Sequence, residues 1–283
     1  MSLTLDIVIP VKDLADQVAR CVEPLAAQLH EGDRIVVVDD ASTDGTGAAA
    51  RAAGAEVLAL ASSRGPYFAR QVAASRSTAA ALIFIDGRCR PLPGLLDSHR
   101  ALLARDGVAL SCTDVRTLSG DSLAARIAAI QQPFSLTGYV GVPGRLDFFP
   151  TANLGVIRSA FVAVGGFREM RSGADADLCW RIQQAGLGSL AADPTVHMEW
   201  APRSTMRSLL EQWNRYGRST AYLEWVHPEQ SPTATGRRVS LKNELAKRAL
   251  AVAALAPSAA YLAGLRQGRR ATMVAPKPYE NPS

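Results

Sequence analysis

Short apolar segments alternate with helical segments over the first hundred residues of this chain. Residues 3–9, 34–38, 56–60 and 81–85 have the length and the β-branched content of buried strands. The segments between them carry apolar residues at helical spacing, and Asp13 is placed to cap the first helix. Repeated strand–helix units predict an α/β fold, with a mostly parallel sheet covered by helices on both faces.

The rest of the chain is less regular and predicts a helical extension beyond the sheet. We expect a catalytic domain over residues 1–222, a linker and C-terminal helical extension over 223–271, and a disordered tail over 272–283. The expected elements are strands at 108–112 and 153–157, helices at 122–131, 174–184, 203–222 and 241–267, a loop at 132–150 and a linker at 224–238.

Composition and charge narrow the class of protein. The chain has 283 residues with 31 Lys+Arg against 26 Asp+Glu, a net charge of +5. This mild excess suits an anionic ligand but does not form the basic stripe of a nucleic-acid-binding protein. The four cysteines lack the spacing of a zinc site or a disulfide framework, and residues 1–10 do not resemble a signal peptide. We therefore expect a cytoplasmic protein with reduced thiols.

Acidic residues follow the predicted strands where the sheet would bind a ligand. Asp39, Asp40 and Asp86 come directly after two apolar segments, and the carboxyl ends of parallel strands form the binding edge of such sheets. They could hold a nucleotide or a metal, or cap the next turn. The chain has no GxGxxG, GxxxxGK[ST] or GxSxG motif, which argues against the usual dinucleotide site, a P-loop and a hydrolase elbow.

Five segments occur in an order that resembles one enzyme family. They are IVIPVKD at 7–13, VVVDDASTDGT at 36–46, FARQVAASRSTAAALIFIDGRCRP at 68–91, TANLGVIRSAFVAVGGF at 151–167 and GADADLCWRIQQAG at 173–186. Over about residues 3–200 the chain resembles the family 2 glycosyltransferases with the type A (GT-A) fold. The resemblance implies a Rossmann-like GT-A domain that transfers a sugar, with inversion, from a nucleotide-diphosphate sugar to an acceptor hydroxyl.

The resemblance also implies roles for the residues that bind the donor. Pro10, Val11 and Asp39 match the positions that contact the nucleotide. Arg70 matches the arginine near the diphosphate or ribose. Asp86 matches the first acid of the family's DxD motif.

The remaining matched positions concern catalysis and the acceptor. Asp175 matches the general base, the carboxylate that takes the acceptor proton as the new bond forms. Gly165, Gly166 and Phe167 match the turn on the acceptor side. His197 matches a histidine that helps to bind the metal or the pyrophosphate.

Two departures from the family pattern leave the mechanism open. The DxD motif is Asp86-Gly87-Arg88 here, and the acid before Asp175 is Ala174. One hypothesis is that Arg88, with Arg90, partly replaces the metal on the diphosphate. A second is that Asp86 and His197 hold Mg2+ or Mn2+. A third is that activity is lost, which would leave a catalytically degenerate nucleotide-sugar-binding protein.

The late helical segments bear on the acceptor and on membranes. Arg203, Arg207, Arg215 and Arg218 share a predicted helix with Trp213 and Tyr216; this helix is either a lid over the diphosphate or acceptor, or a solvated basic face. Residues 249–265 are 17 residues without charge, shorter than the roughly 20 that a membrane span needs. They predict either a packed helical pair or peripheral contact with an anionic lipid surface through residues 241–270, at the inner face of the membrane.

Overall fold

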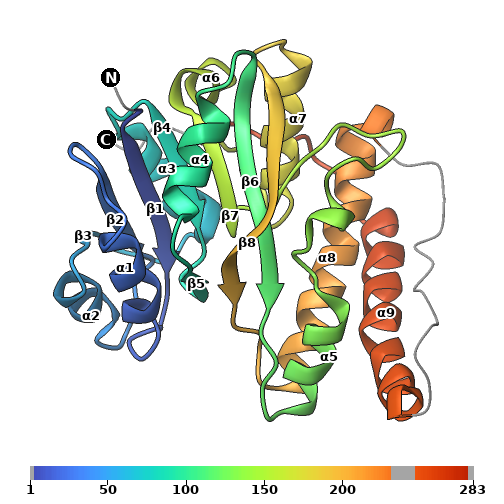
Figure 1. The fold of residues 1–283 in the computed structure, drawn as a ribbon. Coiled ribbons are helices and arrows are strands. Elements are labelled where there is room, and N and C mark those ends of the chain that lie inside the picture. Colours follow the sequence, from blue (N-terminus) through green and yellow to red (C-terminus); the bar gives the residue numbers. More distant parts are fainter. Residues whose placement is uncertain (1–2, 231–245, 280–283) are drawn as a thin grey trace.

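The sheet of this protein has a parallel half and a mixed half. The computed structural model describes residues 3–230 and 246–279. Within them, eight strands form one sheet in the order β3-β2-β1-β4-β7-β6-β8-β5 (Figure 1). The strands are β1 (Leu5–Val11), β2 (Arg34–Asp39), β3 (Glu56–Ala59), β4 (Ala81–Ile85), β5 (Cys89–Pro91), β6 (Val108–Thr117), β7 (Asn153–Ile157) and β8 (Ser189–Trp200).

The parallel half brings three strand ends to one edge. β1 pairs in parallel with both β2 and β4, and Val11 lies opposite Asp39 in the register. β7 is antiparallel to β4 and β6, whereas β6 and β8 are parallel and β5 is antiparallel to β8. Asp39 and Asp86, at or after the ends of β2 and β4, therefore lie on the same edge of the sheet.

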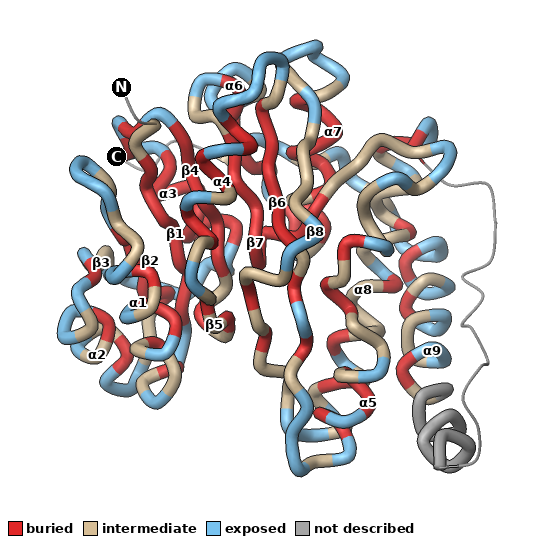
Figure 2. Tube along the Cα trace, in the orientation of Figure 1, coloured by how far each residue is buried: buried red, intermediate tan, exposed pale blue. Residues whose placement is uncertain are grey.

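Helices cover both faces of the sheet, as the sequence predicts. α1 (Val18–Ala26) and α4 (Leu95–Leu103) lie in front of it in Figure 1, and α3 (Pro66–Ser75) and α7 (Ala174–Gln184) lie behind. The shorter helices α2 (Thr46–Ala52) and α6 (Arg158–Ala163) complete these layers. The strands β1, β4 and β7 between them are buried along most of their length (Figure 2). Their apolar side chains lose water on both faces, which is the main favourable term for this fold. The expected α/β class is confirmed.

Some local expectations were wrong. Asp13 does not cap a helix, because α1 begins only at Val18. Asp13 instead has a positive φ of 49°, and its carboxylate accepts a hydrogen bond of 2.8 Å from the amide of Thr43. β5 and β8 were not expected, since β8 is rich in polar residues and contains Pro194.

The C-terminal extension packs as helices beside the sheet. α8 (Met206–Val226) and α9 (Ala246–Arg270) pack against each other, and α5 (Leu123–Gln131), which comes before β7 in the chain, contacts both. The single turns η1 (Leu136–Gly138) and η2 (Pro228–Gln230) follow α5 and α8, respectively. The expected domain boundary at 222 falls inside α8. The segment 231–245, which includes most of the expected linker, lies outside the described residues.

Glycines let the backbones of α8 and α9 touch. A Cβ atom added to Gly217 would overlap the carbonyl oxygen of Tyr261, and one added to Gly264 would overlap that of Asn214. α9 continues through Pro257 as one helix and packs on α8, so this segment does not form a helical pair of its own. In the part of the chain that the structure describes, no helix is long and apolar enough to cross a membrane.

The tail after α9 is ordered by contacts with the sheet domain. The amide of Glu169 donates a 2.7 Å hydrogen bond to the carbonyl of Lys277, and Tyr279 packs edge-on against Phe68 with ring centroids 5.5 Å apart. The expected disorder of residues 272–283 is therefore wrong as far as residue 279, while residues 280–283 lie outside the described part.

Candidate active site

The loops that follow β1 and β2 are joined by hydrogen bonds. The amide of Leu14 donates to the hydroxyl of Thr46 over 2.7 Å, and the amide of Ser42 donates to Asp39 Oδ1 over 2.8 Å. β1 ends with the buried residues Pro10 and Val11. The carbonyl of Val11 accepts a hydrogen bond from the amide of Asp40, the residue that follows Asp39. The three expected nucleotide-binding positions thus form one rigid corner at the edge of the sheet.

The adjacent Asp40 is used by the fold itself. Its carboxylate accepts hydrogen bonds from Ser63 Oγ at 2.8 Å, from the Arg64 amide at 2.7 Å and from the Gly65 amide at 3.0 Å. These three donors satisfy a buried charge and shape the turn that leads into α3. Asp40 is therefore occupied, which leaves Asp39 as the acid of this pair next to the loop.

A buried arginine faces the acid at the end of β4. Arg70, on α3, is 2% exposed and forms an ion pair with the carboxylate of Asp86. The guanidinium carbon lies 5.4 Å from the centre of the Tyr67 ring. The Nε atom of Arg70 is buried and has no hydrogen-bond partner among the described residues. Arg70 therefore neutralises Asp86 and keeps one donor unused.

Gly87 determines how the chain turns after Asp86. A Cβ atom at Gly87 would lie 2.8 Å from Val11 Cγ1, closer than real Cβ contacts allow, and 3.0 Å from Leu14 Cδ1, which is a tight contact. The glycine lets the turn lie directly on the end of β1. The position of Arg88 relative to Asp86 follows from this contact.

Replacing Gly87 by Ala is expected to destabilise the protein by about 1–3 kcal/mol, since the added methyl group overpacks the contact with Val11. Denaturant unfolding measures this. Gly45→Ala is the matched control, because a Cβ there meets nothing within 4 Å. Equal effects of the two changes would show that the contact is not tight.

Asp175 lies in the first turn of α7, at the same edge. Its Oδ2 accepts from the amide of Thr151 at 3.4 Å and its Oδ1 from the amide of Ala176 at 3.0 Å. Burial raises the pKa of Asp175, while these amides and the charge of Arg70 act in the opposite direction. The carboxylate is thus held by weak donors in a poorly solvated position, which suits a group that accepts a proton.

Asp177, two residues further on, has a structural role. It is fully buried and accepts hydrogen bonds from Arg181 at 2.8 Å, His227 at 2.9 Å and Arg168 at 3.2 Å. Burial by itself would raise the pKa of Asp177, but the bond from His227 and the charges of Arg181 and Arg168 lower it. Asp177 joins α7 to the end of α8 and does not face the strand ends.

The glycine turn at 165–167 is fastened to α3. Gly165 and Gly166 have φ values of 76° and 69°, which glycine adopts without strain. The amide of Phe167 donates to Gln71 Oε1 over 2.9 Å, and the Phe167 ring lies 5.5 Å from that of Tyr67. The expected acceptor side is therefore connected to the helix that carries Arg70.

The structure does not bring His197 to Asp86. Nδ1 of His197 donates to the carbonyl of Pro93 at 3.0 Å, and Nε2 lies 3.5 Å from Asp193. The amide of Leu92 donates to the carbonyl of His197, whereas the amide of Cys89 donates to the carbonyl of Asp86. Leu92 and Cys89 are three residues apart, which is about 10 Å along a strand. Across residues 3–230 and 246–279, no three His, Cys, Asp or Glu side chains form a group that could hold a metal ion.

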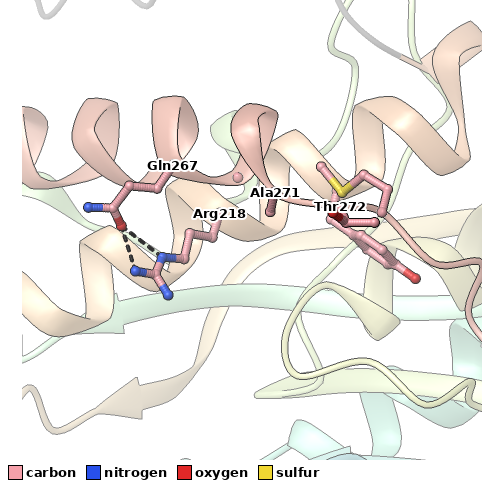
Figure 3. Close-up of a pocket in the computed structure, with 7 residues that line it drawn as sticks. Arg218, Gln267, Ala271 and Thr272 are labelled. Carbon is pink, nitrogen blue, oxygen red and sulfur yellow. Dashed lines mark hydrogen bonds between the residues drawn. The ribbon is translucent and has the colours of Figure 1, made fainter.

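A separate hollow of about 410 Å³ lies between α8, α9 and the tail (Figure 3). Its lining includes Arg218, whose guanidinium donates to Gln267 Oε1, as the close-up shows. None of the site residues expected from the sequence lines it. The candidate active site is at the strand ends, because the charged groups converge there and not at this hollow.

The family assignment follows from a sequence comparison. The model of the family "Glycosyl transferase family 2" matches residues 6–165, more than half of the chain. The chain belongs to glycosyl transferase family 2. This family model ends before α7, so Asp175 and the helical extension lie outside the matched part.

Two curated relatives are glycosyltransferases by name. A pre-mycofactocin glycosyltransferase of Mycobacterium tuberculosis is 32% identical over 237 residues, which are 80% of this chain and 48% of that protein. The glycosyltransferase AglE of Haloferax volcanii is 30% identical over 122 residues, 41% of this chain and 38% of that one. This member of the family therefore spans about half the length of the first curated relative that it matches.

Solved structures confirm the GT-A fold. The mannosyltransferase PcManGT of Pyrobaculum calidifontis, in complex with GDP-Man and Mn2+, has a TM-score of 0.62 at 15% identity and covers 97% of this chain and 77% of that one. Glucosyl-3-phosphoglycerate synthase of M. tuberculosis, in complex with Mn2+, UDP and phosphoglyceric acid, has a TM-score of 0.59 at 18% identity and covers 82% and 80%.

Two buried tyrosine hydroxyls lie near the candidate site, and sequence reasoning missed Tyr67. Burial raises the pKa of both hydroxyls, so both stay protonated near neutral pH. The negative charges of Asp175 and Asp86 act on the hydroxyl of Tyr67 and raise its pKa. This hydroxyl accepts a 3.3 Å hydrogen bond from the amide of Gly173. The same two carboxylates also raise the pKa of Tyr216 on α8. Tyr67 comes directly before the segment FARQ that carries Arg70, and this neighbouring position is the sequence signal that could have identified it.

Proposed function

We propose that this chain is an inverting glycosyltransferase that moves a sugar from a nucleotide-diphosphate sugar to an acceptor hydroxyl. The observation that carries the proposal is the convergence of Asp175, Asp86, Arg70 and Tyr67 at the carboxyl edge of a family 2 GT-A sheet. Donors bind at such edges, and transfer needs a proton acceptor beside them.

In this proposal Asp175 is the general base. The acceptor oxygen forms a bond to the anomeric carbon while the bond from that carbon to the diphosphate breaks. Asp175 takes the acceptor proton, and the nucleoside diphosphate leaves. Positive charge and hydrogen-bond donors near the leaving group lower the energy of this step. The unused Nε–H of Arg70 is one such donor at this edge.

The donor would lie across the loops after β1, β2 and β4. Pro10, Val11 and Asp39 would face the nucleotide, and Asp86 and Arg88 the ribose and diphosphate. The turn at Gly165, Gly166 and Phe167 would border the acceptor. We place the protein in the cytoplasm, with peripheral membrane contact through residues 241–270 as an option for a lipid-borne acceptor.

The alternative is a nucleotide-sugar-binding protein that has lost activity, which the residues Arg88 and Ala174 favour. Calorimetry with a panel of UDP- and GDP-sugars, followed by turnover assays, separates the two. Pre-mycofactocin and 3-phosphoglycerate, the acceptor types in the relatives' names, are the first acceptors to include. Binding with turnover supports the transferase, and binding without turnover of any donor supports the alternative.

We expect kcat/KM to fall as the pH falls, with an apparent pKa above the usual aspartate value of about 3.9. The reason is that burial raises the pKa of Asp175, so the base is protonated earlier on acidification than an exposed aspartate. The measurement is the pH profile of kcat/KM at saturating acceptor. An acidic limb at or below 3.9 would exclude Asp175 as the titrating base.

A further inference from the structure

Two arginines lie near each other at the turn that follows Asp86. Arg88 is half-buried, and its carbonyl accepts a 3.1 Å hydrogen bond from the amide of Ala201, just after β8. Arg203 follows Ala201 by two residues and is also half-buried. The antiparallel pairing of β5 with β8 therefore places Arg88 beside the segment that carries Arg203, near enough for the two charges to interact.

Neither arginine has an acidic partner. Within residues 3–230 and 246–279, no ion pair includes Arg88 or Arg203, although Asp86 is next to the turn. Asp86 is already paired with Arg70. Arg88 also lines a small hollow together with Arg20 and Arg90, which adds positive charge to the same surface.

The acids present do not fit a divalent cation. Mg2+ and Mn2+ bind through several oxygen ligands, and a transferase site shares them with the diphosphate. Asp86 is the one carboxylate left of the DxD motif and is engaged by Arg70, while His197 bonds to Pro93 instead. The site thus has cationic side chains where a cation would need anionic ones.

We propose that Arg88 and Arg203 bind the diphosphate of the donor directly and take the place of a divalent cation. The proposal rests on the function proposed above. Guanidinium groups donate paired hydrogen bonds to phosphate oxygens, so two of them match the two phosphates of a nucleoside diphosphate. Arg203, which no motif pointed to as a partner of Arg88, becomes a donor-binding residue.

The electrostatics agree with an anion at this place. Burial lowers the pKa of Arg88, and the nearby charge of Arg203 lowers it further, while Asp86 acts weakly in the opposite direction. Two poorly solvated like charges repel each other, and a bound diphosphate would offset both the repulsion and the lost hydration.

The test measures binding by calorimetry with inorganic pyrophosphate, UDP and GDP as probes, each in EDTA and in MnCl2. For the unaltered protein we expect pyrophosphate and one of the nucleotides to bind equally well in both conditions. Arg88→Ala and Arg203→Ala should each weaken binding about ten- to hundredfold. Arg126→Ala removes an exposed arginine on α5 and should change nothing. Arg88→Lys keeps the positive charge but loses the paired N–H donors of the guanidinium, and it serves as the test if Arg88→Ala does not fold. We expect Arg88→Lys to weaken binding.

A reciprocal variant makes the test sharper. Arg88→Asp restores the second acid of DxD, and we expect its nucleotide binding to be lost in EDTA and recovered in MnCl2. Metal-dependent binding by the unaltered protein, or unchanged binding in the folded Arg88 and Arg203 variants, would overturn the proposal. Nucleotide binding that needs Mn2+ would contradict the arginine site but not the transferase. Pyrophosphate binding without any nucleotide binding would support the site and contradict the transferase.

Discussion

Replacing Asp175 by Asn should lower kcat by about two to four orders of magnitude while donor affinity stays within a few-fold. The side-chain amide keeps the shape of the carboxylate, and its oxygen can still accept the 3.0 Å hydrogen bond from the amide of Ala176. It cannot take a proton from the acceptor. Steady-state kinetics and calorimetry with the donor measure the two effects separately.

The same variant should be at least as stable as the unaltered protein. Burial raises the pKa of Asp175 above its unfolded value, so keeping the charge at neutral pH costs folding free energy. Removing the charge removes this cost, and the Tm should not fall. Asp121→Asn, at an exposed aspartate, is the control for both measurements. Turnover at the unaltered rate would remove Asp175 from the mechanism.

Replacing Asp177 by Asn should have the opposite pattern, with a loss of about 3–5 kcal/mol of stability. Asp177 is fully buried and compensates Arg181, Arg168 and the bond from His227. The neutral side chain leaves the buried Arg181 and the half-buried Arg168 without their counter-charge. Urea unfolding followed by circular dichroism measures the loss. A loss below about 1 kcal/mol would mean that the cluster does not stabilise the fold.

The control for Asp177 is an exposed ion pair. Glu211→Gln breaks the 2.9 Å pair with Arg207 on the surface of α8, which is worth at most about 1 kcal/mol.

The stabilisation by Asp177 depends on pH. Because folding lowers the pKa of Asp177, this stabilisation is present above the pKa of the unfolded chain, near 3.9, and is lost as the pH falls through the lower pKa of the folded protein. The Asp177→Asn variant should therefore lose less stability than the unaltered protein in that acidic range.

Most of the sheet could be predicted because its strands carry their own signal. The apolar runs at 81–85 and 153–157 became β4 and β7 within the expected bounds, and residues 174–184 became α7. β8 could not be predicted, since its polar residues are paired with β6 and β5 along the backbone and need no apolar pattern. The order of the tail also depends on a distant contact, that between Glu169 and Lys277.

The site was predictable in its strand ends but not in its pairings. Asp39, Asp86 and Arg70 could be named from strand position and motif. No local pattern indicated that Asp177 compensates two arginines. The absence of His197 from the neighbourhood of Asp86 depends on the register of β8 with β5, which no local pattern encodes.

The close approach of α8 and α9 limits which substitutions this chain can accept over evolutionary time. Gly217 follows Tyr216 directly, so a larger residue at 217 or 264 would push the two helices apart and move Tyr216 away from the carboxylates. A genetic screen for loss of function should therefore recover changes at Gly264, which lies on α9 outside the sheet, as well as changes at Asp175. Homologues free to vary elsewhere on α9 should retain glycine at these two crossing points.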